Sequence, residues 1–148
     1  MISRGSIIWA VVPDPNGKII LDKNGNPKEH PCVVLNTQEY IDSKQPLVCA
    51  AISTKFDANR PKHWIWLPGK PGGHIETGLN EPSVVKSDWL VPSVDQNNIR
   101  RVSPRPLAVP TVKQILKWLE DNQGFKLVEP NPKPTTSLLP RSRPDATM

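Results

Sequence analysis

The stretch His30-Pro-Cys-Val-Val-Leu-Asn-Thr-Gln-Glu-Tyr-Ile-Asp-Ser-Lys-Gln-Pro-Leu-Val-Cys-Ala-Ala-Ile-Ser-Thr54 decides the fold. It contains two short apolar runs, Cys32–Leu35 and Leu47–Ile52, and a largely polar segment separates them. Runs of this length, rich in β-branched residues and flanked by proline, are typical of buried strands. The centre of the chain therefore predicts two neighbouring strands.

Three further segments extend this pattern toward both ends of the chain. Ile7–Val12 is an apolar run that ends at a proline, and His63–Leu67 is a similar run bounded by prolines. Ser83–Lys86 and Asp88–Val91 together predict a fifth strand with a bend near its middle. Short strands separated by loops rich in proline and glycine indicate a closed or partly closed β-barrel.

One segment near the C-terminus has helical periodicity instead. Four apolar residues recur there at helical spacing: Val112, Ile115, Leu116 and Leu119. Thr111 and Gln114 have the spacing of a capping box, which predicts that the helix begins at this threonine. Gly124 is a suitable residue for its C-terminal end. We expect the apolar stripe of this helix to pack on the barrel or to help form a dimer contact.

The remainder of the chain has a different composition. Residues 126–148 read KLVEPNPKPTTSLLPRSRPDATM, with repeated proline and few large apolar side chains. Such a segment buries too little surface to offset the entropy lost on ordering. The sequence therefore predicts a barrel domain over residues 1–125 and a disordered or loosely docked tail over residues 126–148.

Composition limits the possible class of protein. The 148 residues suit one domain, and no stretch approaches the roughly 20 apolar residues of a membrane span. The N-terminus lacks the pattern of a secretory signal, so a cytoplasmic protein is expected. A net charge of +5 permits an anionic partner such as RNA. Cys32 and Cys49 lie in apolar runs without CxxC spacing, which favours buried free thiols over a disulfide between neighbouring strands.

Five segments, taken in order, resemble the MazF/PemK family of bacterial toxins. These segments are Arg4–Trp9, His30–Leu35, Val48–Thr54, Thr77–Leu79 and Ser83–Leu90. They resemble the family's first strand, its Arg-Pro-x-Val-Val strand, the strand that ends in a catalytic threonine or serine, and its Gly-Leu and Ser-x-Val stretches. The resemblance covers roughly residues 3 to 123. It implies an SH3-like small β-barrel with a C-terminal α-helix, a mainly β fold of the α+β kind.

The resemblance also implies an activity and partners. Members of the family are the toxin components of type II toxin–antitoxin systems and cleave single-stranded RNA at short sequences without a metal or other cofactor. The expected partners are therefore a cognate antitoxin, single-stranded RNA such as mRNA, and a second copy of the chain in a homodimer. Three scattered histidines show no spacing typical of metal ligands, so we expect no metal site.

His30 is the main departure from the family pattern, because an arginine that acts on the scissile phosphate normally stands there. A histidine titrates near neutral pH, so His30 could act as an acid, a base or a cation opposite the phosphate. The resemblance makes His30 and Ser53 the candidate catalytic residues, with Ser53 orienting the phosphate or the 2′-hydroxyl. Further candidates for RNA binding are Arg4, Thr54, Lys55 and Lys86.

Other interpretations of these residues stay open. His30 could be a loop-end histidine without a role, and Ser53 could be a hydroxyl that only satisfies the backbone. The chain could then be a catalytically inactive barrel that binds RNA or a protein. Gyrase binding, as in CcdB-type toxins, is the least favoured alternative because the proline-rich tail does not resemble the helical ending of those toxins. The five tryptophans have apolar neighbours, so we expect most of them in the core, with at most one available to stack on a base.

Overall fold

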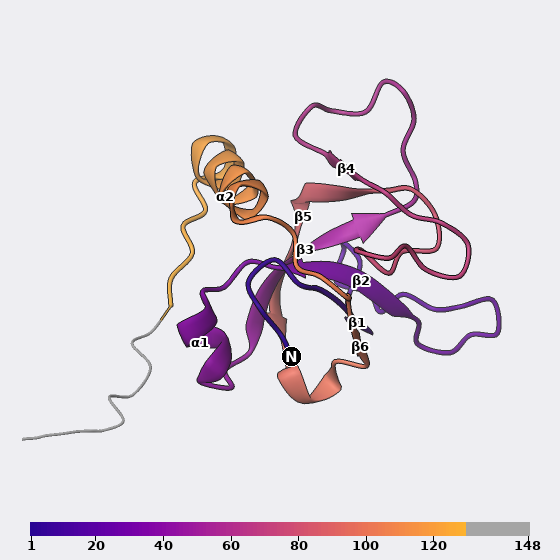
Figure 1. Cartoon of the computed structure of the whole chain (residues 1–148), viewed down its shortest axis with the longest axis horizontal. Helices are drawn as coiled ribbons and strands as arrows, with labels where there is room; N and C mark the ends of the chain where they lie inside the picture. Colours follow the sequence, from indigo (N-terminus) through magenta and orange to yellow (C-terminus); the bar gives the residue numbers. More distant parts are fainter. Residues whose placement is uncertain (130–148) are drawn as a thin grey trace, which may run out of the picture.

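Residues 1–129 of the chain are described by a computed structural model. It contains one antiparallel sheet, and a helix follows the last strand toward the C-terminus of the chain (Figure 1). The elements in chain order are β1 (Ile7–Val11), β2 (Glu29–Val34), α1 (Gln38–Asp42), β3 (Leu47–Ser53), β4 (Ile65–Leu67), β5 (Ser83–Val94), a short 3-10 helix (Gln96–Asn98), β6 (Arg101–Val102) and α2 (Val109–Gln123).

The six strands pair in the order β4-β5-β3-β2-β1-β6, and every pairing is antiparallel. The register between β3 and β5 shifts twice, as at β-bulges, between Leu47 and Cys49 and again between Ala50 and Ile52. Bulges bend a strand and increase its twist, which explains how the 12-residue β5 curls the sheet into a half-barrel (Figure 1). The predicted fold class, a small β-barrel with a C-terminal helix, is therefore confirmed, with the partly closed form observed.

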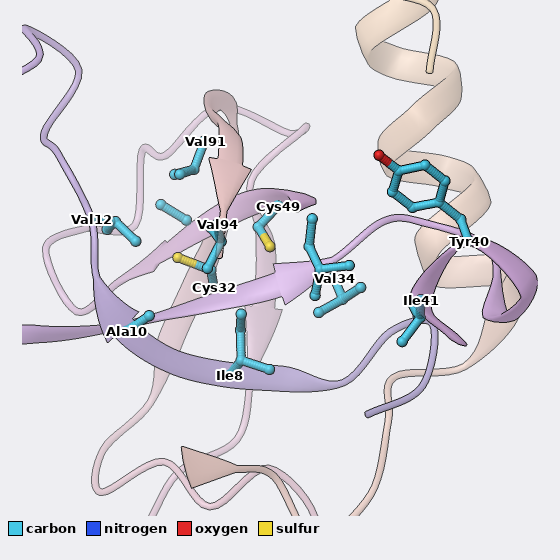
Figure 2. Close-up of a cluster of buried hydrophobic side chains, with 12 residues drawn as sticks. Ile8, Ala10, Val12, Cys32, Val34, Tyr40, Ile41, Cys49, Val91 and Val94 are labelled. Carbon is cyan, nitrogen blue, oxygen red and sulfur yellow. The ribbon is translucent and has the colours of Figure 1, made fainter. Parts of the chain in front are cut away.

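The alternation of side chains along the strands builds one apolar cluster on each face of the sheet. The cluster inside the curl contains Ile8, Val34 and Val91, and Tyr40 and Ile41 of α1 join it (Figure 2). The other cluster lies under α2, which contributes the buried side chains of Val112, Ile115 and Leu119. Both faces of the sheet are thus buried, which agrees with the nearly unbroken apolar runs in the sequence.

Both cysteines belong to the cluster inside the curl and are free thiols, as expected (Figure 2). Burial raises the pKa of the Cys32 thiol to about 12 and also raises the pKa of Cys49. These side chains are therefore packing residues and not nucleophiles.

Helix α2 begins earlier than the sequence predicts. Its N-cap is Ala108, which makes no side-chain cap, and Pro110 lies in the first turn, where a missing N–H costs nothing. Thr111 already lies inside the helix, so the predicted capping box is wrong. Gly124 ends the helix in the left-handed conformation with φ of 63°, as predicted.

Three elements were not predicted, since all are very short: α1, the 3-10 helix and β6. Helix α1 has five residues and is capped by the Thr37 hydroxyl, and β6 has two residues.

The predicted tail falls largely outside the described residues. In its described part, the Glu129 carboxylate accepts hydrogen bonds from the Thr37 N–H at 2.8 Å and hydroxyl at 2.9 Å. No helix within residues 1–129 is long and apolar enough to cross a bilayer.

Candidate active site

The ends of three strands form a cleft of about 730 Å³. In the antiparallel pairing of β2 and β3, Cys32 lies opposite Ala51. Continuing this register by two residues places His30 opposite Ser53, on the same face of the sheet. Both side chains line the cleft. The structure thus brings together the two residues that the sequence nominates for catalysis.

The His30 imidazole is half-buried under an aromatic neighbour. Its ring centroid lies 4.9 Å from that of Trp89, and the planes are tilted by 43°. Its Nε2 atom is buried and has no hydrogen-bond partner among the described residues. Burial lowers the pKa of His30, and the charges of Lys28 and Lys86 lower it further, whereas a backbone hydrogen bond with Ile52 raises it. The net direction is downward, so the imidazole is neutral at neutral pH.

Ser53 closes β3 and is largely buried. Its Oγ accepts a hydrogen bond from the Lys55 N–H at 3.0 Å. The alternative role in satisfying the backbone is therefore observed. Because a hydroxyl has one donor and two acceptor positions, the O–H of Ser53 is still able to donate to a ligand in the cleft.

Cationic side chains flank this pair. Lys86 lies over the Trp64 ring, 4.4 Å from Nζ to the centroid, and the Trp64 Nε1–H donates to Asp88 at 2.6 Å. A cation–π contact holds the ammonium group at the wall of the cleft without removing its charge. Lys28 and Lys55 line the same cleft. Glu29, Glu81 and Asp88 line the cleft as well, so its wall carries charges of both signs, and the three lysines are the groups that suit a phosphodiester.

The remaining sequence candidates divide between the cleft and other surfaces. Thr54 is exposed and lines the cleft beside Ser53. Arg4 does not line the cleft. It precedes Gly5, whose N–H donates to the Val34 carbonyl, at the end of β2 remote from His30. The structure therefore does not bring Arg4 to the other candidates.

The tryptophans meet the expectation of a core role only in part, since Trp9, Trp89 and Trp118 pack against the two apolar clusters. None of the five is fully buried, and Trp9, Trp64 and Trp89 all line the cleft. Arg101, on β6, lines it as well. The sequence carried no local signal for these roles, because each depends on which strand lies beside another. Residue type was the only available hint, since tryptophan and arginine are the side chains that stack on bases.

The described residues contain no group of three or more His, Cys, Asp or Glu side chains placed to hold a metal ion. The cleft contributes imidazole, hydroxyl, ammonium, guanidinium, carboxylate and indole groups. These groups are suited to proton transfer, hydrogen bonding and stacking.

No protein-family model matches this chain, and no curated protein matches it. Among solved structures, it is similar to a chain from a structure described as "Endoribonuclease in complex with its cognate antitoxin from Mycobacterial species". The match has a TM-score of 0.50 and 13% sequence identity, and it covers 86% of this chain and 100% of that chain. The two chains share a fold.

Proposed function

We propose that this protein is a metal-independent, sequence-specific endoribonuclease that cleaves single-stranded RNA, and the toxin component of a type II toxin–antitoxin system. The observation that carries the proposal is that His30 and Ser53, from the neighbouring strands β2 and β3, line one cleft together with three lysines. The similar solved structure is described as an endoribonuclease with its antitoxin, which supports the same class of activity.

The proposed reaction is an internal transesterification. The 2′-hydroxyl oxygen of one ribose attacks the adjacent phosphorus, a P–O2′ bond forms, and the P–O5′ bond breaks. The products are a 2′,3′-cyclic phosphate and a 5′-hydroxyl. A base must take the proton of the 2′-hydroxyl, an acid must protonate the leaving 5′-oxygen, and donors must stabilise the charge on the phosphorane.

The side chains of the cleft supply the base and the donors, and the 5′-oxygen takes its proton from His30 once the imidazole has accepted the proton of the 2′-hydroxyl, directly or through water. A neutral His30 is in the correct state to accept the proton of the 2′-hydroxyl. Lys86, held over Trp64, supplies the fixed positive charge that an arginine at position 30 would otherwise provide. Ser53 donates its hydroxyl hydrogen to a phosphate oxygen, since its lone pair already binds the Lys55 N–H.

The proposal includes the partners and location that go with this class. A cognate antitoxin would block the cleft, and the active form would be a homodimer in the cytoplasm. The net charge of +5 favours an RNA partner, because contacts with phosphate supply most of the sequence-independent affinity.

A second candidate function is a barrel that binds RNA or a protein without cleaving RNA. Two observations favour it: the Nε2 atom of His30 is buried beneath Trp89, and Ser53 already bonds to the backbone. A buried nitrogen without a partner, such as Nε2 of His30, costs about 1–3 kcal/mol. If Trp89 moved, the 2′-hydroxyl of the RNA could bond to this nitrogen and recover that energy. The first candidate therefore requires the Trp89 ring to move when RNA binds.

The deciding experiment is cleavage of a long mixed-sequence RNA by the purified full-length chain in EDTA, followed by sequencing of the fragment ends. We expect discrete fragments with cyclic phosphate ends. His30→Ala and Ser53→Ala should each lower the rate by roughly 10²-fold or more. Ser93→Ala and Lys113→Gln are matched controls, since both side chains are exposed and lie outside the cleft. Intact RNA in the presence of excess protein would refute the enzymatic proposal and favour the binding module.

A further inference from the structure

An arginine and a tryptophan form a stacked pair that lines the same cleft as His30 and Ser53. The Arg101 guanidinium carbon lies 3.8 Å from the centroid of the Trp9 ring. Its Nη2 donates a hydrogen bond to the Gly78 carbonyl at 3.1 Å. Arg101 is exposed and Trp9 is half-buried, and both line the cleft. The guanidinium is thus fixed on one face and at one edge.

The backbone around this pair is built to hold it. Trp9 and Arg101 are register partners in the pairing of β1 and β6. Gly78 has φ of 73°, and a Cβ at this position would lie 3.3 Å from both Trp9 Cη2 and Pro104 Cδ. Only glycine meets both demands without strain, since it tolerates this conformation and leaves room for the indole ring. The same glycine supplies the carbonyl that binds Arg101.

The pair lies next to the candidate catalytic residues but on the other face of the sheet. Along β1, Trp9 pairs with Pro31 and the next residue, Ala10, pairs with His30. Since side chains alternate between faces, Trp9 and His30 point to opposite sides. The cleft is lined by residues of both sides, so it extends around the ends of the strands.

A planar cation that is fixed in this way offers a stacking surface. Unpaired RNA bases stack on aromatic side chains and on arginine guanidinium planes. With the indole behind it, the guanidinium of Arg101 presents its other face to the cleft. Asn80 is exposed and lines the same cleft, and its amide carries a donor and an acceptor that suit the edge of a base.

We propose that Arg101, stacked on Trp9, binds one unpaired nucleobase of the RNA beside the cleaved phosphate. This inference rests on the proposed ribonuclease function. The base lies on the face of Arg101 opposite the indole, with its edge toward Asn80. Arg101 is a base-binding residue in this arrangement and not a catalytic one.

The test is a binding measurement that separates bases from phosphates. Fluorescence anisotropy compares a labelled mixed-sequence 2′-O-methyl oligonucleotide, which lacks the attacking hydroxyl, with an abasic oligonucleotide of equal length. Arg101→Lys retains the charge and loses the planar stacking surface. Arg100→Lys is the matched control, because Arg100 is exposed, adjacent and outside the cleft lining.

We expect Arg101→Lys to weaken binding of the base-containing oligonucleotide by roughly 5- to 10-fold. Binding of the abasic oligonucleotide, the salt dependence of binding, and both affinities of Arg100→Lys should not change. Equal losses of affinity for both oligonucleotides would show that Arg101 contacts phosphate. No loss of affinity for either would show that Arg101 contacts neither base nor phosphate. Each of these results overturns the inference and leaves the ribonuclease proposal standing. A wild-type chain that binds neither oligonucleotide and does not cleave RNA would refute both proposals.

Discussion

Ser103 joins β6 to β1 in the interior of the protein, and removing its hydroxyl tests how strongly this edge of the sheet is held. Its Oγ accepts a hydrogen bond from the Ile7 N–H at 3.0 Å and donates one to the Arg105 carbonyl at 2.8 Å. Ile7 is fully buried, and Ser103 is 9% exposed. Ser103→Ala therefore leaves a buried backbone donor without its partner.

The expected loss follows from these two bonds. The Ile7 N–H, a buried donor left unsatisfied, costs about 1–3 kcal/mol. Loss of the bond to the Arg105 carbonyl costs about 1 kcal/mol more, because water replaces the serine hydroxyl at this exposed residue only in part. We expect the free energy of unfolding to fall by about 2–4 kcal/mol in total. In a chain of this size each kcal/mol lowers the melting temperature by about 2–4 °C.

Urea unfolding, followed by circular dichroism, measures this quantity. The midpoint of Ser103→Ala should move to lower urea at an unchanged m-value. Ser93→Ala is the control, because Ser93 is exposed on β5, and its change should stay within about 0.5 kcal/mol. If the two variants lost equal stability, the Ile7 N–H would have found another partner and the reasoning from the buried hydrogen bond would be refuted.

Four further predictions concern the cleft, the loops and the start of α1. The rate of RNA cleavage should rise with pH through the lowered pKa of His30, so the midpoint of the pH–rate profile should lie below pH 6.5, and Lys86→Gln should move this midpoint upward because it removes a neighbouring positive charge. Because the neutral form of His30 is favoured in the folded state, its contribution to the free energy of unfolding is present above pH 6.5 and is lost as the pH falls through the folded pKa. A His30→Asn variant that kept this pH dependence would contradict its assignment to His30. Gly69→Ala should destabilise the protein by about 1–3 kcal/mol in thermal unfolding, since the added Cβ would overlap the backbone of Glu81, and an unchanged melting temperature would contradict this contact. Glu129→Gln should expose the start of α1 to faster hydrogen exchange by weakening charge-assisted bonds worth about 1.5–3 kcal/mol, whereas equal exchange rates would show that the contact adds no stability.

Much of the fold was predictable from local sequence patterns. The apolar run at Leu47–Ile52 identified β3, the segments Ser83–Lys86 and Asp88–Val91 identified most of β5, and Gly124 marked the end of α2. Ends of elements were less predictable: the capping-box pattern at Thr111 misplaced the start of α2, because a proline in the first turn permitted an earlier start. A capping box is a local pattern, and other residues nearby can satisfy the same backbone groups.

The candidate site was predictable only in part. His30 and Ser53 were nominated by the resemblance to a toxin family, and the pairing of β2 with β3 brings them to one cleft. Trp89 over His30 and Arg101 over Trp9 were not predicted, although each involves a residue type known for stacking. These contacts join strands that are far apart in the chain, so no spacing along the sequence encodes them.

The sequence by itself determined which segments become strands and helix, because apolar periodicity and the conformational limits of proline and glycine act over a few residues. The tertiary structure alone decided which strands pair and which side chains are in contact. The bulged register of β5 set the curl of the sheet, and the pairing of β1 with β6 placed Arg101 on Trp9. The pKa of His30 also depends on neighbours from other segments, since burial and the charges of two lysines lower it together. Register and burial are properties of the whole packed chain, and they become defined only when segments separated by tens of residues meet.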